Sequence, residues 1–271
     1  MGPIGVFDSG YGGLTVLNDF IKRLPNYDFI YLGDNARTPY GTRSFEVVYE
    51  YTLQAVNRLF DMGCPMVILA CNTASAKALR SIQQNDLSRI DSNLRVLGVI
   101  RPSVEALGSI SKNCHIGVVG TSGTVLSQSY PLEIAKLYPE FVVSQEACPM
   151  WVPLVENNEY NSSGADYFIQ KNLNNLFKTD PLIDTLILGC THYPILENKI
   201  RQYLSPEVQI MSQGSIVAES LFDYLNRHPE MDNRCSKNGK VEFFTTENPE
   251  KFSQTASIFV GYEIKVNHLT L

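Results

Sequence analysis

The sequence predicts an α/β protein built from two pseudo-twofold-related α/β domains with mainly parallel sheets, and an active site in the cleft between them. Two observations carry this prediction. Short apolar or β-branched runs alternate along the 271 residues with longer helical patterns, which is typical of right-handed βαβ units. Two short motifs also recur in the second half of the chain in the same order, which indicates an internal duplication.

Individual elements follow from local patterns. Strands are predicted where short apolar runs occur, over residues 4–7, 28–32, 66–70, 96–100, 115–119, 185–188 and 208–211. A helix over residues 14–24 ends at Pro25, and a second helix over residues 44–61 begins at Ser44, a good N-cap residue. Residues 66–70 (MVILA) form a continuous apolar run, as expected of a strand buried on both faces of a parallel sheet.

Composition and charge exclude several classes of protein. The chain has 22 basic and 28 acidic residues and a net charge of −6, so we expect no nucleic-acid partner. No apolar run approaches the roughly 18 residues of a membrane span, and the first residues lack the basic and apolar regions of a signal peptide. We therefore expect a cytoplasmic protein that does not bind a membrane.

The six cysteines are scattered, with no C-x-x-C pair. This spacing argues against a zinc site and against a disulfide framework. No cluster of metal ligands and no lysine context typical of pyridoxal phosphate is visible either. The sequence therefore predicts neither a metal nor a cofactor.

The duplication rests on two pairs of segments. Residues 4–10 (IGVFDSG) match residues 116–122 (IGVVGTS) at an offset of 112, and residues 68–73 (ILACNT) match residues 187–192 (ILGCTH) at an offset of 119. Two similar offsets favour two homologous halves, although chance matching of short apolar runs is the alternative. We place the first domain at residues 1–99 plus 211–271 and the second at residues 100–210.

Cys71 and Cys190 are singled out by their position, because each follows a buried strand and precedes a polar pair that can open a helix. Ligands of parallel sheets bind at the carboxyl ends of the strands, and a helix N-terminus there favours the thiolate. Two thiols facing each other suit the inversion of a stereocentre, which needs a base on one face and an acid on the other. Two buried structural cysteines, or a redox pair, are the alternatives.

Other polar residues stand near these strand ends. Asp8 precedes a glycine-rich turn whose backbone N–H groups could hold a carboxylate, although Asp8 could equally cap the next helix. His192 lies two residues after Cys190, close enough to influence its protonation. The polar loop over residues 33–41 either binds a ligand or only turns the chain, and Glu156 alone would be taken as a surface carboxylate.

Five segments together resemble the glutamate racemases of the cofactor-independent aspartate/glutamate racemase superfamily. They span nearly the whole chain in the family's order: residues 7–13 (FDSGYGG), 33–41 (GDNARTPYG), 70–75 (ACNTAS), 148–156 (CPMWVPLVE) and 189–194 (GCTHYP). The combination of Cys-Asn-Thr with Cys-Thr-His in one chain is the most specific part of the resemblance.

The resemblance implies direct interconversion of L- and D-glutamate, which supplies D-glutamate for peptidoglycan, and commonly a homodimer. It implies Cys71 and Cys190 as the two acid/base thiols, Asp8 assisting the first, His192 the second, and supporting roles for Asp34 and Glu156. The substrate contacts that it implies are Asp8, Ser9, Tyr40, Gly41, Asn72, Thr73, Thr191 and His192.

Three segments depart from the family's usual pattern. Residues 101–103 (RPS) stand where Pro-Gly is common, Trp151 where a smaller apolar residue is frequent, and residues 211–214 (MSQG) lack an acidic residue often found there. None is a residue implied in the chemistry. They leave the rim of the cleft and the dimer less well defined.

Three other functions are kept as alternatives. An aspartate racemase differs in a pocket one methylene shorter, which few residues decide. A non-catalytic two-lobed amino-acid-binding protein would have paired α/β halves but no need for a thiol on each. A thiol redox enzyme is disfavoured by the missing C-x-x-C pair.

Overall fold

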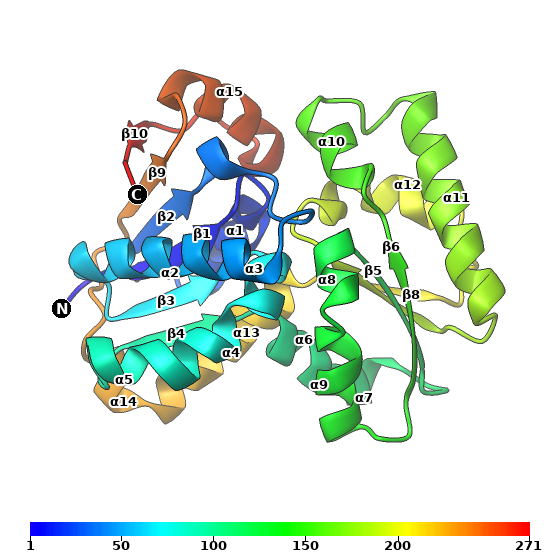
Figure 1. Cartoon of the computed structure of the whole chain (residues 1–271), viewed down its shortest axis with the longest axis horizontal. Helices are drawn as coiled ribbons and strands as arrows, with labels where there is room; N and C mark the ends of the chain where they lie inside the picture. The colour runs from blue at the N-terminus through cyan, green and yellow to red at the C-terminus, as the bar shows by residue number, and fades with distance from the viewer.

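The computed structural model describes all residues 1–271 and has two parallel β-sheets, each covered by helices (Figure 1). We call the six-stranded sheet with its helices the larger lobe and the four-stranded sheet with its helices the smaller lobe. The two lobes lie side by side, and both chain termini belong to the larger one (Figure 1). No helix has the length and apolar character needed to cross a membrane.

The larger sheet has the strand order β10-β9-β2-β1-β3-β4, with all neighbours parallel. Its strands are β1 (Ile4–Asp8), β2 (Phe29–Gly33), β3 (Met66–Leu69), β4 (Arg95–Gly98), β9 (Val241–Thr245) and β10 (Val266–His268). The helices of the segments that form it are α1 (Gly13–Arg23), α2 (Phe45–Asp61), α3 (Asn72–Lys77), α4 (Leu79–Ser81), α5 (Leu87–Ile90), α13 (Gly214–Arg227), α14 (Pro229–Asp232) and α15 (Pro249–Val260).

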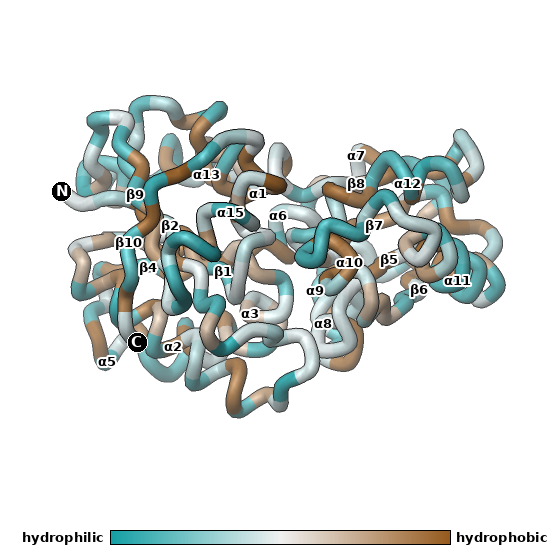
Figure 2. The backbone as a smooth tube through the Cα atoms, turned by 90° about the horizontal axis from the view of Figure 1, so that it is seen from above, coloured by the Kyte–Doolittle hydropathy of each residue, from teal (hydrophilic) through white to brown (hydrophobic).

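The smaller sheet has the order β6-β5-β7-β8, also parallel throughout. Its strands are β5 (His115–Gly120), β6 (Val142–Ala147), β7 (Thr185–Gly189) and β8 (Gln209–Met211). The helices between β4 and β8 are α6 (Ile100–Glu105), α7 (Leu107–Ile110), α8 (Ser122–Leu126), α9 (Ser129–Leu137), α10 (Trp151–Glu156), α11 (Ser163–Thr179) and α12 (Glu197–Gln202). Seen from above, the hydrophilic helix α11 lies at the outer end of this lobe (Figure 2).

The two sheets share one strand order. The run β2-β1-β3-β4 of the larger sheet corresponds to β6-β5-β7-β8 of the smaller one, so β1 is equivalent to β5 and β3 to β7. These are the strands that carry the two repeated motifs of the sequence. The predicted fold class, two related α/β units with parallel sheets, is confirmed.

The seven strands predicted from apolar runs are all present, and Ser44 caps α2 by accepting a hydrogen bond from the Val47 N–H. Three strands were missed by the sequence patterns: β6, β9 and β10. β6 is an edge strand with the polar sequence VVSQEA and no fully buried residue. β10 is a three-residue edge strand. Such strands lack the continuous apolar run that burial on both faces imposes.

Helix α1 joins the larger sheet to the returning part of the chain. Leu14, Leu17 and Phe20 are completely buried, at a spacing that places them on one face of the helix. α1 packs against α13, whose buried residues include Val217 and Leu221. This packing holds the segment after β8 on the larger lobe.

We expect Leu17→Ala to lower the free energy of unfolding by about 2–5 kcal/mol, because it leaves a cavity between α1 and its neighbours. The same substitution at Leu126 is the control, since that side chain is 79% exposed and should change stability by no more than about 0.5 kcal/mol. Urea unfolding of both variants measures the difference. Equal losses would contradict the packing described for α1.

Candidate active site

Cys71 lies at the carboxyl end of β3, at the N-cap of α3. Its Sγ accepts a hydrogen bond from the Ala74 N–H at 3.5 Å and lies 3.4 Å from the Ser9 Oγ, which follows β1. The side chain is 6% exposed. The thiol therefore stands between the loops that follow two neighbouring strands of the larger sheet.

Burial, followed by the nearby Asp8 carboxylate and to a smaller extent Cys190, raises the pKa of Cys71 to about 12. The sequence predicted the opposite direction, from the helix N-terminus after the cysteine. α3 has only six residues, and its contribution, the Ala74 N–H, is outweighed by the loss of water around the sulfur. The raised pKa favours the protonated thiol of Cys71 at neutral pH.

Asp8 ends β1 and is completely buried. Its Oδ1 accepts the Gly10 N–H at 2.9 Å, and its Oδ2 accepts the Thr191 Oγ–H of the smaller lobe at 3.3 Å. Burial raises the pKa of Asp8, while the positive charge of His192 and the hydrogen bonds lower it by less. The carboxylate therefore touches the loops of both lobes.

Cys190 follows β7 and shares its loop with His192. The Cys190 Sγ lies 3.9 Å from the His192 Nδ1, and the His192 Nε2 lies 2.9 Å from the Glu156 Oε1 at the end of α10. Burial alone would lower the pKa of His192, but its hydrogen bonds to Cys190 and Glu156 raise it to about 10. The second thiol thus has an imidazolium beside it, held by a carboxylate.

The loops of the two lobes approach closely at Gly12. A Cβ added there would lie 2.2 Å from the Thr191 Oγ1 and 2.4 Å from the His192 Nδ1, so no larger residue fits without displacing the loop after β7. Gly41 likewise lies at a close approach between the two lobes. Its carbonyl accepts the Gly123 N–H at 2.7 Å, and a Cβ there would lie 2.8 Å from Thr121.

Asp34 supports the polar loop after β2 and makes no hydrogen bond to either cysteine. Its Oδ2 accepts the Tyr40 O–H at 2.5 Å and the Arg37 Nε–H at 2.6 Å, and its Oδ1 accepts the Thr246 O–H at 2.8 Å. Tyr40 is itself buried, and burial together with Asp34 raises its pKa. Asp34 thereby holds the Tyr40 side chain in place, in the same loop as Gly41.

Asn72 and Thr73 open α3 and reach toward the smaller lobe. The Asn72 Nδ2 donates to the Gln213 Oε1 and its Oδ1 accepts from the Tyr130 hydroxyl, both at 2.7 Å. The Thr73 Oγ1 lies 2.9 Å from the Thr121 Oγ1. The structure thus gathers the loops after β1, β3 and β7 around the two thiols.

Three residues in these contacts were missed from the sequence: Tyr130, Gln213 and Thr121. Thr121 had a signal, because the repeat aligns it with Ser9. Gln213 stands in a segment noted only for departing from the family's pattern. Tyr130 lies on α9 with no local motif, so only the tertiary structure could reveal it.

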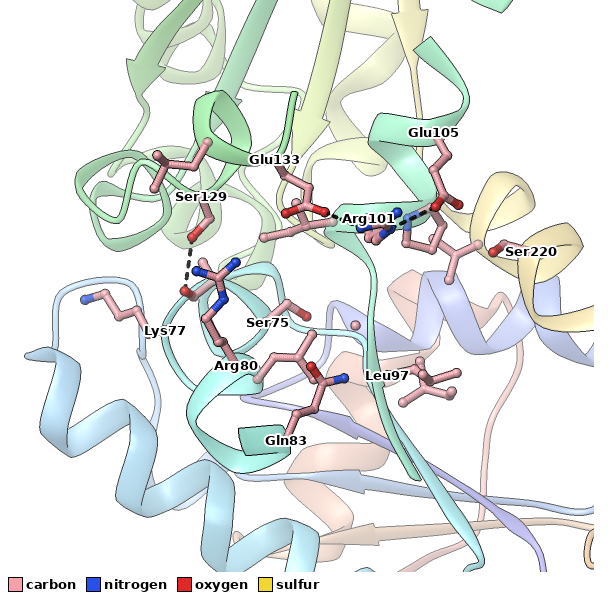
Figure 3. A pocket seen from close by; sticks show the side chains of 18 of the residues that line it. Ser75, Lys77, Arg80, Gln83, Leu97, Arg101, Glu105, Ser129, Glu133 and Ser220 are labelled. Atoms are coloured by element: carbon pink, nitrogen blue, oxygen red, sulfur yellow. Dashed lines mark hydrogen bonds and ion pairs between the residues drawn. The ribbon is translucent and has the colours of Figure 1, made fainter. Parts of the chain in front are cut away.

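A separate cavity of about 580 Å³ lies between α4, α6, α9 and α13 (Figure 3). Its lining includes none of the site residues predicted from the sequence. Arg101 at this cavity is held by Glu105 and Glu133, at 2.9 Å from each. No group of three or more His, Cys, Asp or Glu side chains is arranged to hold a metal ion.

The fold and site define a class of protein with two related α/β lobes, each with a cysteine after its third strand. The residues that follow these cysteines, Asn72, Thr73 and Thr191, make hydrogen bonds between the lobes. The chain belongs to the Asp/Glu/Hydantoin racemase family, whose match covers residues 17–221.

Individual relatives agree with this membership. The chain is 40% identical to a glutamate racemase of Streptococcus pyogenes over 269 residues, which are 99% of this chain and 98% of the relative. The solved glutamate racemase of Bacillus anthracis superposes with a TM-score of 0.90 at 36% identity, covering 100% of this chain and 98% of that one. The Francisella tularensis glutamate racemase, solved with D-glutamate, gives 0.88 at 32% identity, covering 99% and 97%.

We expect His192 to remain protonated at neutral pH, so its imidazole resonances should not titrate between about pH 5 and 8 in NMR of histidine-labelled protein. The Glu156→Gln variant lacks one partner that stabilises the imidazolium, so the pH at the midpoint of the His192 titration should fall. Because the pKa is raised from 6.5 to about 10 on folding, this charge stabilises the fold fully below about pH 6.5 and ceases to do so as the pH rises through about 10. A His192 titration midpoint near pH 6.5 in the wild type would contradict the hydrogen bonds described between His192, Cys190 and Glu156.

Proposed function

We propose that the chain is a cofactor-independent glutamate racemase, an isomerase that interconverts L- and D-glutamate and supplies D-glutamate for peptidoglycan. The observation that carries the proposal is the pair Cys71 and Cys190, which end equivalent strands of two related lobes and have different proton-handling partners. The relatives at 32–40% identity, each a glutamate racemase, support this substrate.

The reaction follows from the two thiols. A thiolate on one face of the substrate removes the Cα proton, and a thiol on the opposite face delivers another proton, so the stereocentre inverts. The protonated His192 stabilises negative charge on the Cys190 sulfur, and Cys71 with its raised pKa holds its proton ready for delivery. In the reverse direction the roles exchange, with Asp8 as the carboxylate nearest to Cys71.

By resemblance to the family, Cys190 abstracts the proton of L-glutamate and Cys71 that of D-glutamate. The substrate would be held by Asp8, Ser9, Tyr40, Gly41, Asn72, Thr73, Thr191 and His192. Asp34 and Glu156 act through other residues, because Asp34 binds Tyr40 and Glu156 binds His192.

Three further assignments are part of the proposal. The chain divides into domains at residues 1–99 plus 211–271 and 100–210, it forms a homodimer, and it works in the cytoplasm. The two positions where the chain passes between the sheets, after β4 and after β8, support the division.

Exchange of the substrate's Cα proton tests the activity. We expect the purified chain, with no cofactor added, to incorporate deuterium from D₂O at Cα of glutamate and to bring either enantiomer to an equal mixture. Aspartate, one methylene shorter, should react about 10–200-fold more slowly. No exchange would favour a non-catalytic binding protein, and faster exchange on aspartate would favour an aspartate racemase.

Single cysteine variants test the two-thiol mechanism. We expect Cys71→Ser and Cys190→Ser each to lower racemisation by orders of magnitude, because a serine hydroxyl is too weakly acidic to serve as the base. A 3-chloroglutamate needs only one proton removed before it eliminates chloride. Cys71→Ser should therefore still eliminate from the L-enantiomer and Cys190→Ser from the D-enantiomer.

Enantiomer preference is the decisive readout, measured as chloride release from each 3-chloroglutamate. The opposed-thiol mechanism is wrong if both variants prefer the same enantiomer, or if either variant racemises glutamate at the wild-type rate. Neither outcome would change the assignment of the chain to its family.

A further inference from the structure

The chain passes between the two sheets twice, and the two passages meet in one buried hydrogen-bond network. Val99 follows β4 at the first passage, and Gln213 follows β8 and directly precedes α13 at the second. The Gln213 Nε2 donates to the Ser103 Oγ at 2.7 Å and lies 3.4 Å from the Val99 carbonyl oxygen. Gln213 is 4% exposed.

Gln213 closes a ring of three hydrogen bonds with Asn72 and Tyr130. Asn72 donates through Nδ2 to the Gln213 Oε1, Gln213 donates through Nε2 to the Tyr130 hydroxyl, and Tyr130 donates to the Asn72 Oδ1, each at 2.7 Å. Every member of the ring donates one bond and accepts one. Such a closed cycle strengthens each of its bonds by polarisation.

The direction of the ring is set by Ser103. Its hydroxyl donates to the Val99 carbonyl at 2.8 Å, so its oxygen must accept from Gln213. That bond fixes the Gln213 amide with Nε2 toward Ser103 and Oε1 toward Asn72. Asn72 must then donate through Nδ2 and accept through Oδ1, so its amide cannot flip.

This arrangement leaves Asn72 with one free Nδ2 hydrogen and one free Oδ1 lone pair, because no other side-chain hydrogen bond involves it. Asn72 directly follows Cys71 and is 2% exposed. A free donor suits the carboxylate of an amino acid, and a free acceptor suits its ammonium group.

The Tyr130 ring lies on the side of the second cysteine. A Cβ added at Gly189, the residue before Cys190, would lie 3.2 Å from the Tyr130 ring. The Tyr130 hydroxyl thus binds Asn72, which follows Cys71, and the Tyr130 ring leaves little room for a side chain at Gly189, which precedes Cys190.

We propose that Gln213 is a positioning residue for the racemase reaction, which fixes the orientation of the Asn72 amide for substrate binding. This inference rests on the proposed function, in which Asn72 contacts the substrate. Gln213 itself acts only through Asn72.

Two substitutions at Gln213 and one control test the proposal. Gln213→Met keeps the length of the side chain and removes both its donor and its acceptor. We expect it to raise KM for both enantiomers about tenfold, the effect of one hydrogen bond, with kcat changed by less than about threefold. Gln209→Met is the matched control, because that side chain is exposed on β8 and makes no hydrogen bond; it should leave both constants unchanged.

Gln213→Glu gives a readout that a purely structural role would not move. An ionised Glu offers no donor to Ser103 or Tyr130, whereas a protonated one can donate to Tyr130 and restore the ring. The ratio of its KM to that of the wild type should therefore fall as the pH is lowered. Circular dichroism and thermal melting confirm that each variant is folded.

A double-mutant cycle with Asn72→Ala separates an effect of Gln213 on the Asn72 amide from a general effect of Gln213 on the stability of the fold. In the Asn72→Ala background, Gln213→Met should change kcat/KM by less than about twofold, because Gln213 has no amide left to orient. An equal loss in both backgrounds, or no effect of Gln213→Met in the wild type, would overturn the proposal.

Titration of each variant with D-glutamate distinguishes this failure from failure of the proposed function. If the wild type binds D-glutamate but exchanges no Cα proton, the racemase function fails, and weaker binding by Gln213→Met alone still supports the positioning of Asn72. If Gln213→Met binds as tightly as the wild type, the positioning role is wrong whatever the activity.

Discussion

The buried carboxylate of Asp8 is the interaction on which the rest of the site depends. Removing such a charge from water costs on the order of several kcal/mol, and the cost must be offset by nearby donors and positive charge. The donors are the backbone N–H groups of Gly10 and Gly13 and the Thr191 hydroxyl, and the positive charge is that of His192. Two of these partners, Thr191 and His192, belong to the other lobe, so they offset part of the cost only when the loops after β1 and β7 meet.

The same contact explains the chemistry around each thiol. The loops can approach because Gly12 has no side chain, and their approach excludes water from both sulfurs. Near Asp8 this raises the pKa of Cys71, whereas at Cys190 the imidazolium of His192 offers the opposite charge. The two lobes therefore share a strand order and differ in the charge near the cysteine: the negative Asp8 near Cys71 and the positive His192 near Cys190.

The passages between the sheets lie next to this site. Gln213 and Val99 contact each other where the chain enters and leaves the smaller lobe, and the ring through Tyr130 connects them to Asn72. Any change in how the lobes sit against each other would therefore act on the residue beside Cys71. Asn72, beside Cys71, and the connection between the lobes therefore belong to one hydrogen-bonded unit.

The alternation of strands and helices and the internal repeat are predictable from the sequence alone, as is the placement of Cys71, Cys190, Asp8 and His192. Each of these features is encoded in a short segment: an apolar run, a repeated motif, or a polar residue at a strand end. The raised pKa of Cys71 and the hydrogen bonds of Tyr130 and Gln213 become visible only in the tertiary structure. Their partners lie from 58 to 141 residues away along the chain, and no local pattern encodes such a contact. Edge strands such as β6 were missed for a related reason, since pairing on one side alone does not demand the apolar run that burial imposes.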